Sequence, residues 1–419
     1  MLKRDITEQI HSQFESRDII LITGPRSAGK STLLQSIKNE LKYAGKAVIT
    51  LSLDDEKDAW NFRSSIGFTQ YIASQVGNGT VYICIDNAES HSETAEILRD
   101  IYDSNFPYHF IITCTGDRSV KEHYESILNT RLKTFTLKSA SFKEFLHFKT
   151  QYHHSNTLLN YFKNHSSPTQ ELVLEYMAYG WYPQVIEKHT VEEKRNAIKE
   201  IYSNHIMRDI SGHIWIRRTD AYKSTLVSLA KRVWTAITLK EIALEWSITF
   251  PTLKQYIEVM ERTYGVRMIP PYSGGEKNTN EITKSPIPYF EDIGIRHYLT
   301  HAFWDFHRIT DDVHAFRNLV ANILIDIADK NKKTLHYWQT KQWASIDFVI
   351  NNGVNIPPLP IEITQHARTN GDITRSMRSF IDRYNPPLAW IITPKYEWII
   401  QIQKTTVRFM PYWYLFLLD

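Results

Sequence analysis

The chain has 419 residues, of which 42% are hydrophobic and 23% are charged. This composition excludes an intrinsically disordered or fibrous protein, and the length indicates about two to four globular domains. The 49 lysines and arginines nearly balance 46 acidic residues, so the net charge of +3 indicates no strongly charged partner. Both cysteines lie in apolar segments, which excludes a disulfide framework and a zinc site. No apolar run reaches the roughly 18 residues of a membrane span, and we expect a cytoplasmic protein without a membrane partner.

The first motif lies near the N-terminus, in the segment IILITGPRSAGKSTLLQSI. Residues 24–31 fit the pattern G-x-x-x-x-G-K-[ST], with a strand expected before the loop and an amphipathic helix after it. Glycines allow the backbone angles that point consecutive N–H groups at phosphates, and the helix N-terminus adds positive potential. We therefore expect this loop to bind ATP through Gly24, Pro25, Arg26, Ser27, Ala28, Gly29, Lys30, Ser31 and Thr32.

Two residues of the loop have a specific chemical role in such sites. Lys30 is expected to reach the β- and γ-phosphates, and the Ser31 hydroxyl is expected to bind Mg²⁺. A later strand should then end in an acid that also holds the metal. The segment VYICIDNAES supplies it, because apolar residues alternate up to Asp86. ATP and Mg²⁺ are therefore the expected ligands.

Asn87 follows Asp86 at the position where the general base of an ATPase is expected. An amide can hold a water molecule but cannot accept its proton, so we expect slow hydrolysis. Glu89 could replace the base only if the end of the strand bends, and Glu93 is farther away. If the base is missing, replacing Asn87 with glutamate is expected to raise turnover.

Two further segments, 47–53 (AVITLSL) and 109–116 (HFIITCTG), are expected to join the same parallel sheet. Helical stretches lie between them, as crossover connections require. Thr115 lies at the end of the strand expected in the second segment and is expected to sense the γ-phosphate. The predicted fold class is therefore α/β, with a P-loop NTPase core.

From 151 to 220 the pattern becomes helical, which predicts a lid over the nucleotide. The next segment, 238–266, predicts two helices with a tight connection, in which Thr249 is the N-cap and Pro251 lies in the first turn of the second helix. A hairpin wing would follow, with its tip at Gly274 and Gly275.

Helix-turn-helix patterns of this kind bind DNA in the major groove. The second helix offers Thr252, Lys254 and Gln255 as DNA contacts. It also carries two glutamates, so a module that docks a partner protein is the alternative.

Two acids near the C-terminus follow a third pattern. Asp347 in ASIDFVI and Glu362 in PIEIT are expected near the ends of adjacent strands. Their spacing resembles the restriction-endonuclease-like core D…(D/E)-x-K, in which two carboxylates bind Mg²⁺ and a lysine positions water. Thr364 stands at the lysine position, so Gln365 or Arg368 would have to activate the water. We expect a nuclease-like domain without cleavage activity.

Several landmarks recur along the chain in a fixed order: TGPRSAGKSTLL, ICIDNAE, IITCTGDRS, TRLKTFTLKSASFKEFL, YGWYPQVI, RDI, PYFEDIGIRHYL, IDFVI and PIEIT. With them the chain resembles a widespread group of prokaryotic AAA-type ATPases that carry a C-terminal domain of unknown function. The resemblance covers nearly the whole chain. That group's usual forms are closer to LxPLSFxEFL and GGFPEVV, and Ser139, Ala140 and Trp181 make this a divergent member.

The resemblance implies a role for Arg131, which matches an arginine that touches the γ-phosphate of a neighbouring subunit. The residue before it is Thr130, where the group has glycine. A solvated surface arginine is the alternative, and Arg118 is a second candidate for the same role. In the nuclease-like part, Arg317 and Ile323 stand where the group has glutamates.

We therefore expect four segments: an AAA-type core (1–150), a helical lid (151–220), a winged helix (221–285) and a restriction-endonuclease-like domain (286–419). The expected function is an ATP-dependent switch with slow hydrolysis that couples nucleotide state to DNA or to a partner protein. One alternative is an ATP-gated DNA nuclease of a defence system or mobile element. Another is a non-hydrolysing regulatory protein that nucleotide stabilises. AAA-type cores often form rings, so a homo-oligomer is a further expectation.

Overall fold

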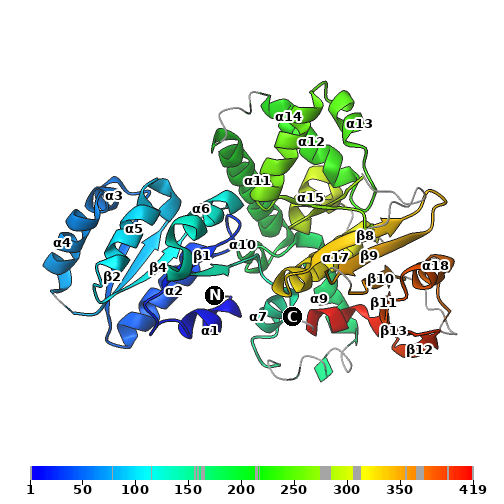
Figure 1. Cartoon of the computed structure of the whole chain (residues 1–419), viewed down its shortest axis with the longest axis horizontal. Helices are drawn as coiled ribbons and strands as arrows, with labels where there is room; N and C mark the ends of the chain where they lie inside the picture. Colours follow the sequence, from blue (N-terminus) through cyan, green and yellow to red (C-terminus); the bar gives the residue numbers. More distant parts are fainter. Residues whose placement is uncertain are drawn as a thin grey trace. The chain divides into compact units, whose positions relative to one another are not determined.

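The computed structural model divides into two compact units, each with its own sheet (Figure 1). The first comprises Met1–Lys149, Trp181–Asp209 and Arg262–Tyr264, and the second comprises Thr150–Gly180, Ile210–Glu261 and Gly265–Asp419. The structure describes residues 2–77, 79–114, 116–154, 157, 160–161, 166–212, 216, 218–273, 285–304, 313–353, 356–364, 372–393 and 396–417. Among these residues, no helix combines the length and the apolar character that crossing a bilayer requires.

A five-stranded parallel sheet forms the centre of the first unit. Its strands are β1 (Ile19–Thr23), β2 (Ala47–Ser52), β3 (Val81–Asp86), β4 (Tyr108–Thr113) and β5 (Leu132–Thr136). They lie in the order β2-β3-β4-β1-β5, and every neighbouring pair is parallel. The predicted α/β fold with a parallel sheet is therefore confirmed. All five strands end at the same edge, which brings residues that are distant in sequence close together.

Helices lie before, between and after these strands. In chain order they are α1 (Ile6–His11), α2 (Lys30–Tyr43), α3 (Glu56–Asn61), α4 (Ser65–Val76), α5 (Thr94–Asp103), α6 (Arg118–Leu128), α7 (Phe142–Lys149), α10 (Pro183–Ile186) and α11 (Val191–Gly212), with the 3₁₀ turns η1 (Ala88–Ser90) and η2 (Asn129–Arg131). Helix α11 extends past the end of the first unit at Asp209.

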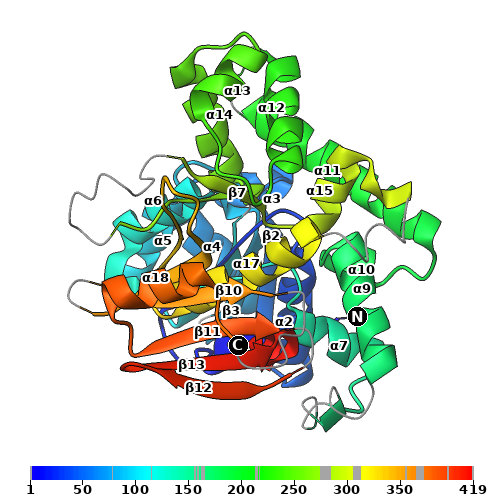
Figure 2. The ribbon, with the colours of Figure 1, turned by 90° about the vertical axis from the view of Figure 1, so that its right-hand side faces the viewer.

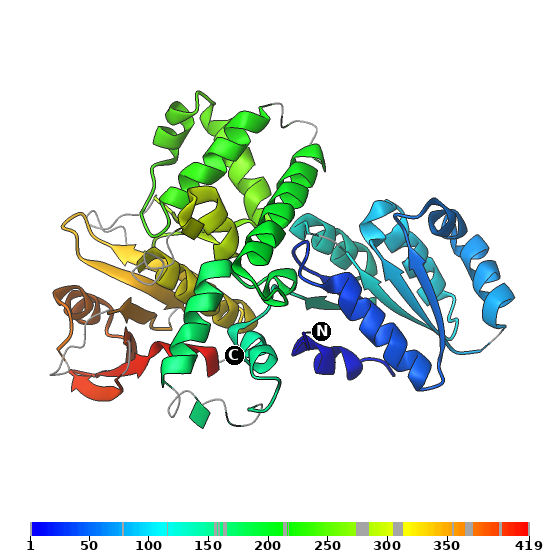
Figure 3. The ribbon, with the colours of Figure 1, turned by 180° about the vertical axis from the view of Figure 1, so that it is seen from behind.

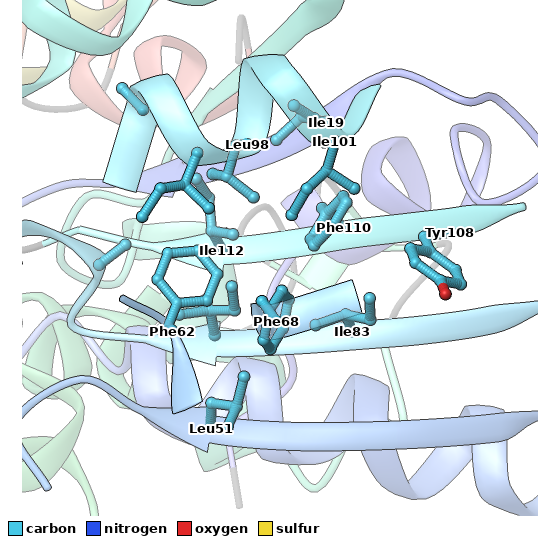
Figure 4. Close-up of a cluster of buried hydrophobic side chains, with 14 of the residues drawn as sticks. Ile19, Leu51, Phe62, Phe68, Ile83, Leu98, Ile101, Tyr108, Phe110 and Ile112 are labelled. Carbon is cyan, nitrogen blue, oxygen red and sulfur yellow. The ribbon is translucent and has the colours of Figure 1, made fainter. Parts of the chain in front are cut away.

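Alternate side chains of each strand point to opposite faces, so the sheet has two cores. Ile19 and Leu21 of β1 lie in one core, which α4, α5 and α6 complete (Figure 4). Ile20 and Ile22 lie in the other, where they pack with α2 and with Ile10 of α1. Figure 3 shows α1, in dark blue near the N-terminus, beside α2. Both faces are buried, which explains why these strands are almost continuously apolar.

The second unit contains a six-stranded mixed sheet. Its strands are β8 (Thr334–Gln339), β9 (Ser345–Asn351), β10 (Leu359–Ile363), β11 (Leu388–Thr393), β12 (Trp398–Ile402) and β13 (Thr405–Pro411). Their order is β12-β13-β11-β10-β9-β8, part of which can be followed in Figure 2. Strands β8, β9 and β10 form an antiparallel meander, whereas β10 and β11 are parallel because α18 (Arg375–Tyr384) connects them.

The remaining described elements of the second unit are helical apart from one hairpin. They are α9 (Ser166–Tyr179), α12 (Thr219–Lys231), α13 (Leu239–Glu245), α14 (Phe250–Arg262), α15 (Ile293–Thr300), η3 (Ala302–Trp304), α17 (Val313–Lys330), η4 (Tyr412–Leu417) and the antiparallel strands β6 (Val266–Ile269) and β7 (Ile287–Phe290). The two helices expected in 238–266 are α13 and α14, and the Thr249 hydroxyl accepts a hydrogen bond from Thr252 N. Gly274 and Gly275 lie outside the described residues, and the four-segment division stays a prediction.

Two of the sequence landmarks have a structural explanation. In SFKEFL, Ser141 and Glu144 form a capping box: Ser141 N donates to Glu144 Oε2 at 2.9 Å, and Glu144 N donates to Ser141 Oγ at 3.1 Å. In YGWYPQVI, Gly180 has φ +76° and lies against Asp292. A Cβ atom there would be 2.3 Å from Asp292 Oδ1, so only glycine fits.

We expect Gly180→Ala to lower the melting temperature more than Gly353→Ala. Both glycines have positive φ, and alanine costs about 1 kcal/mol there. No atom lies within 4 Å of a Cβ atom built at Gly353. A Cβ atom at Gly180 would instead displace the buried Asp292 carboxylate, which caps α15. Gly180→Ala should therefore cost about 2 to 4 kcal/mol more. Equal melting temperatures for the two variants would contradict this packing.

Candidate functional site

The predicted P-loop leaves the carboxyl end of β1 and leads into α2. Gly24 has φ +144°, and a Cβ atom there would lie 2.0 Å from the carbonyl oxygen of Leu137. Gly29, the N-cap of α2, has φ +95°, and Ser27 is also left-handed with φ 55°. The loop therefore turns tightly between a buried strand and a helix N-terminus, where backbone N–H groups and the helix dipole favour an anion.

Lys30 is the first residue of α2 and is 5% exposed. Its Nζ donates to the carbonyl oxygens of Gly24 at 2.9 Å and Pro25 at 2.7 Å, so the ammonium group is bound by the loop itself. Burial lowers the pKa of Lys30 from 10.5 to about 8, and the Glu89 carboxylate is the strongest opposing charge, ahead of Asp86. Glu89 and Asp86 therefore both act on this ammonium group.

A cavity of about 190 Å³ lies beside the start of α2. Its lining residues are Ser31, Leu34, Gln35, Lys38, Thr50, Leu51, Ser52, Asp58 and Asp86. Ser31 and Asp86, the two predicted metal ligands, thus face the same space. Their oxygen atoms fit Mg²⁺, which proteins usually bind through one or two carboxylates while substrate phosphates and water complete the coordination. Within the described part of the chain, no group of three or more acidic, histidine or cysteine side chains forms a complete metal site.

The end of β3 bends sharply at Asn87, whose φ of 53° and ψ of 48° are left-handed. The Asn87 side chain points to Asp54, with Nδ2 donating to Oδ2 at 2.8 Å, and Ser90 Oγ donates to the same carboxylate. On the other side, Thr113 Oγ1 donates to Asp86 Oδ1 and accepts from Asn87 N at 3.3 Å. The amide of Asn87 is therefore part of the turn that follows the strand.

Glu89 lies in η1, directly after this turn. Tyr124 of α6 holds η1 in place, because its hydroxyl donates to Ala88 O at 2.9 Å. The Tyr124 side chain is buried, and this burial raises its pKa, so the hydroxyl stays a donor. The chain thus turns at Asn87 before Glu89, and the negative charge of Glu89 raises the pKa of Lys30 against the effect of burial.

The two candidate arginine fingers lie at different edges of the first unit. Arg131 precedes β5, whose first residue pairs with Ile19 at the start of β1, so Arg131 lies at the opposite edge from the P-loop. It pairs with Asp103 through Nε–Oδ1 at 2.7 Å and Nη2–Oδ2 at 3.0 Å. Arg118, by contrast, begins α6 after the carboxyl end of β4, and its guanidinium lies 4.5 Å from the centre of the Tyr264 ring. Thr115 lies outside the described residues.

In the second unit, Asp347 lies on β9 and Glu362 on the adjacent strand β10. Asp347 Oδ2 accepts from Ile363 N at 2.7 Å, and Oδ1 lies 3.4 Å from Nη2 of Arg317, an α17 residue. Glu362 Oε2 accepts from Thr374 Oγ1 at 2.8 Å. Burial raises the pKa of Asp347, and the Arg317 charge opposes this shift.

Arg317 therefore supplies the positive charge beside Asp347. Its guanidinium also lies 3.4 Å from the centre of the Trp234 ring, and only 13% of the side chain is exposed. Thr364, at the position of the nuclease lysine, donates its backbone N–H to Ile392 O at 2.9 Å. Gln365 and Arg368 lie outside the described residues.

The three predicted DNA contacts lie on α14. Thr252 bonds to Thr249 through the two hydroxyls at 2.8 Å, and Lys254 Nζ lies 4.8 Å from the centre of the Phe250 ring. Lys254 and Gln255 are exposed and Thr252 is half-buried. This arrangement does not distinguish a DNA contact from a protein contact.

Sequence reasoning missed several residues of the site in the first unit. Asp54 and Asp58 belong to the acidic segment LDDEKD, and their position after a strand of the parallel sheet could have predicted them. Thr113 lies two residues before the predicted sensor Thr115, and its hydroxyl donates a hydrogen bond to Asp86. Tyr124 and Arg4 have no local sequence signal, because their contacts join segments far apart in the chain.

Comparisons with known proteins agree with the topology of the first unit. Residues 16–146 match a family model described as an AAA domain, and residues 170–305 match one described as a domain of unknown function. No curated protein matches the sequence. The chain therefore has a P-loop core of the AAA type, and a second unit with its own sheet is present as well.

Solved structures with some similarity include the replication initiator DnaA bound to AMPPCP and single-stranded DNA. It is 14% identical over 62% of this chain and 90% of that chain, with a TM-score of 0.31. AMPPCP-bound DnaA from Aquifex aeolicus is 15% identical over 61% and 86%, with a TM-score of 0.27. Pif1 helicase from Candida albicans is 15% identical over 42% and 44%, with a TM-score of 0.26. At these TM-scores the similarities support no functional argument.

We expect Lys30→Met to raise the melting temperature of the nucleotide-free protein, most strongly below pH 8. The folded-state pKa of about 8 is below the ordinary 10.5, so the unfolded chain binds more protons between these pH values. Wild-type stability therefore rises with pH across this window, and the advantage of the variant should shrink toward pH 10. Thermal melts of wild type and variant at pH 7 and pH 10 measure this difference in melting temperature. Lys42→Met, at an exposed site on the same helix, is the control. A pH-independent difference for Lys30→Met would contradict the buried charge.

Proposed function

We propose that the chain binds ATP with Mg²⁺ at the P-loop and hydrolyses it, with Glu89 as the general base. The observation that supports the proposal is the left-handed turn at Asn87, after which Glu89 lies in η1, and the Glu89 charge raises the pKa of Lys30. As water attacks the γ-phosphorus, the Glu89 carboxylate accepts a proton from that water and ADP leaves. Lys30 stabilises charge on the phosphates, and Ser31 and Asp86 would hold Mg²⁺, which would supply further charge neutralisation.

Asn87 has a different role in this proposal. Its side chain donates to Asp54, and its backbone N–H donates to Thr113, so it shapes the turn and does not face the reacting water. Asparagine tolerates the left-handed conformation better than most residues. A glutamate at position 87 would lose the bond to Asp54 and place two negative charges together.

We further propose that the ATP-bound state is transmitted to DNA or to a partner protein. The exposed Lys254 and Gln255 on α14 are the candidate contacts, and their mixed surroundings support either partner. Arg131 can reach a γ-phosphate only on a second copy of the chain, because it lies at the sheet edge away from its own P-loop. A finger role for Arg131 therefore requires a homo-oligomer.

The C-terminal sheet is proposed to be a nuclease-like domain without nuclease activity. Arg317 is the observation in favour, because a guanidinium beside Asp347 provides the positive charge that a catalytic metal would provide. The chain also has threonine at the position of the water-activating lysine. The domain then serves as a binding or packing module.

We expect Glu89→Gln to abolish phosphate release while ATP binding persists, since glutamine keeps the shape but cannot accept a proton. The loss should be about a hundredfold or more. Steady-state phosphate release and ATP affinity are both measured, with Glu93→Gln, an exposed residue at the start of α5, as control. Asn87→Glu should lower turnover. If Asn87→Glu raises turnover and Glu89→Gln has no effect, the base lies elsewhere.

Supercoiled DNA incubated with the protein and Mn²⁺ is expected to stay uncut, both with and without ATP. The reason is the Arg317 charge beside Asp347 together with threonine at position 364. The comparison is Asp347→Asn, which keeps the size of the side chain. Nicking by wild type that Asp347→Asn removes would establish the ATP-gated nuclease instead.

A further inference from the structure

Arg4 joins two parts of the nucleotide site from a distance in sequence. It lies two residues before α1, and its side chain is only 8% exposed. Its Nη1 donates to the carbonyl oxygen of Ala28 in the P-loop at 2.6 Å, and its Nη2 donates to that of Lys138 at 2.6 Å. One guanidinium therefore connects the P-loop to the chain that leaves β5.

Glu144 of α7 balances the charge of Arg4. It is equally buried, with 6% of its side chain exposed, and both carboxylate oxygens lie 3.2 Å from Arg4 Nε. The same carboxylate accepts from Asp5 N at 2.8 Å and from Ser141 N at 2.9 Å. Each nitrogen of the Arg4 guanidinium and each oxygen of Glu144 thus has a hydrogen-bond partner, and such bonds help a buried ion pair to be tolerated.

The contact with Ala28 determines which way one peptide plane of the P-loop faces. In a trans peptide the C=O and the following N–H point in opposite directions, and no described peptide bond in the chain is cis. Because the Ala28 carbonyl points at Arg4, the Gly29 N–H points away from Arg4. Phosphate binding by a P-loop requires N–H groups that point away from the supporting structure.

The first residue of the loop is constrained by the same neighbouring segment. Gly24 lies against the carbonyl of Leu137, and Leu137 N donates to Thr23 O at 2.7 Å. Residues 137 and 138 therefore support the beginning of the loop directly and its end through Arg4. Without the guanidinium, the Ala28 end of the loop loses this support.

We infer that Arg4 is a positioning residue for phosphate binding: through Ala28 and Lys138 it holds the P-loop in the shape that presents the Gly29 N–H. The inference rests on the ATP binding proposed above. Arg4 acts through the loop backbone and makes no contact with the nucleotide. The planar guanidinium is essential, because it donates hydrogen bonds to Glu144 and to two carbonyl oxygens at the same time. A lysine ammonium on a flexible chain cannot match all three directions.

The surrounding fold does not depend on Arg4 alone. Ile10 of α1 is fully buried against α2, where it packs with Leu33, Leu34 and Ile37. The N-terminal segment therefore keeps a hydrophobic anchor when Arg4 changes. Arg4→Lys also keeps a positive charge beside Glu144, so we expect it to fold.

The test compares Arg4→Lys with Arg17→Lys. Arg17 precedes β1, and its guanidinium donates to Asn105 Oδ1 and to Tyr102 O at 3.0 Å, so it is a bonded arginine away from the loop. Arg4→Lys should weaken ATP binding about tenfold, as expected for one lost charge-assisted hydrogen bond, with little change in melting temperature. In the nucleotide-free protein, amides of residues 24–33 should exchange faster. Arg17→Lys should change neither quantity.

The inference is overturned if Arg4→Lys binds ATP as tightly as the wild-type protein and its loop amides exchange at the wild-type rate. A loss of ATP affinity that merely follows a lower melting temperature also overturns it, because a purely structural role would produce that result.

If Arg4→Lys fails to fold, the double variant Arg4→Met with Glu144→Gln removes both charges. Its loop exchange and ATP affinity then test the inference in the same way. Loss of ATP binding in Lys30→Ala would show that the ATP measured in these experiments occupies the P-loop. If wild type does not bind ATP but Arg4→Lys speeds exchange, the proposed function fails while Arg4 still positions the loop.

Discussion

The nucleotide site proposed in the first unit depends on the burial of one positive charge, the ammonium of Lys30. A lysine removed from water loses its hydration, and neighbouring groups must compensate. The carbonyls of Gly24 and Pro25 do so by hydrogen bonds, and Glu89 does so electrostatically. The lowered pKa of Lys30 indicates that this compensation is incomplete in the nucleotide-free protein. A phosphate ligand would complete it, which is why the same charge that weakens the fold favours binding.

The parallel sheet is what brings these compensating groups to one place. The P-loop follows β1, Asp54 follows β2, and the Asn87 turn follows β3, all at the edge where parallel strands end. Thr113 at the end of β4 then fixes Asp86, and Leu137 beyond β5 packs against Gly24. Close packing at this edge requires tight turns, and glycine and asparagine supply the positive φ angles of those turns at Gly24 and Asn87.

The sheet and the P-loop could be predicted because their signals are local. Alternating β-branched residues and fixed glycine spacing need only a short window of sequence. The turn that precedes Glu89 could not be predicted, since it depends on the left-handed conformation of Asn87 and on its contact to Asp54, 33 residues away. Arg4 gave no signal either, because its partners Ala28 and Glu144 are 24 and 140 residues distant. Such contacts follow from tertiary packing and not from any motif.

The second unit contains a buried carboxylate whose negative charge is balanced by a neighbouring cation. Asp347 is buried beside Arg317, whose guanidinium also packs on Trp234. A metal ion bound at such a position would come and go with its free concentration. An arginine is covalently attached and always charged, so it has no dissociation constant and is present in every molecule. Arg317 therefore balances the charge of Asp347 whatever the concentration of divalent ions.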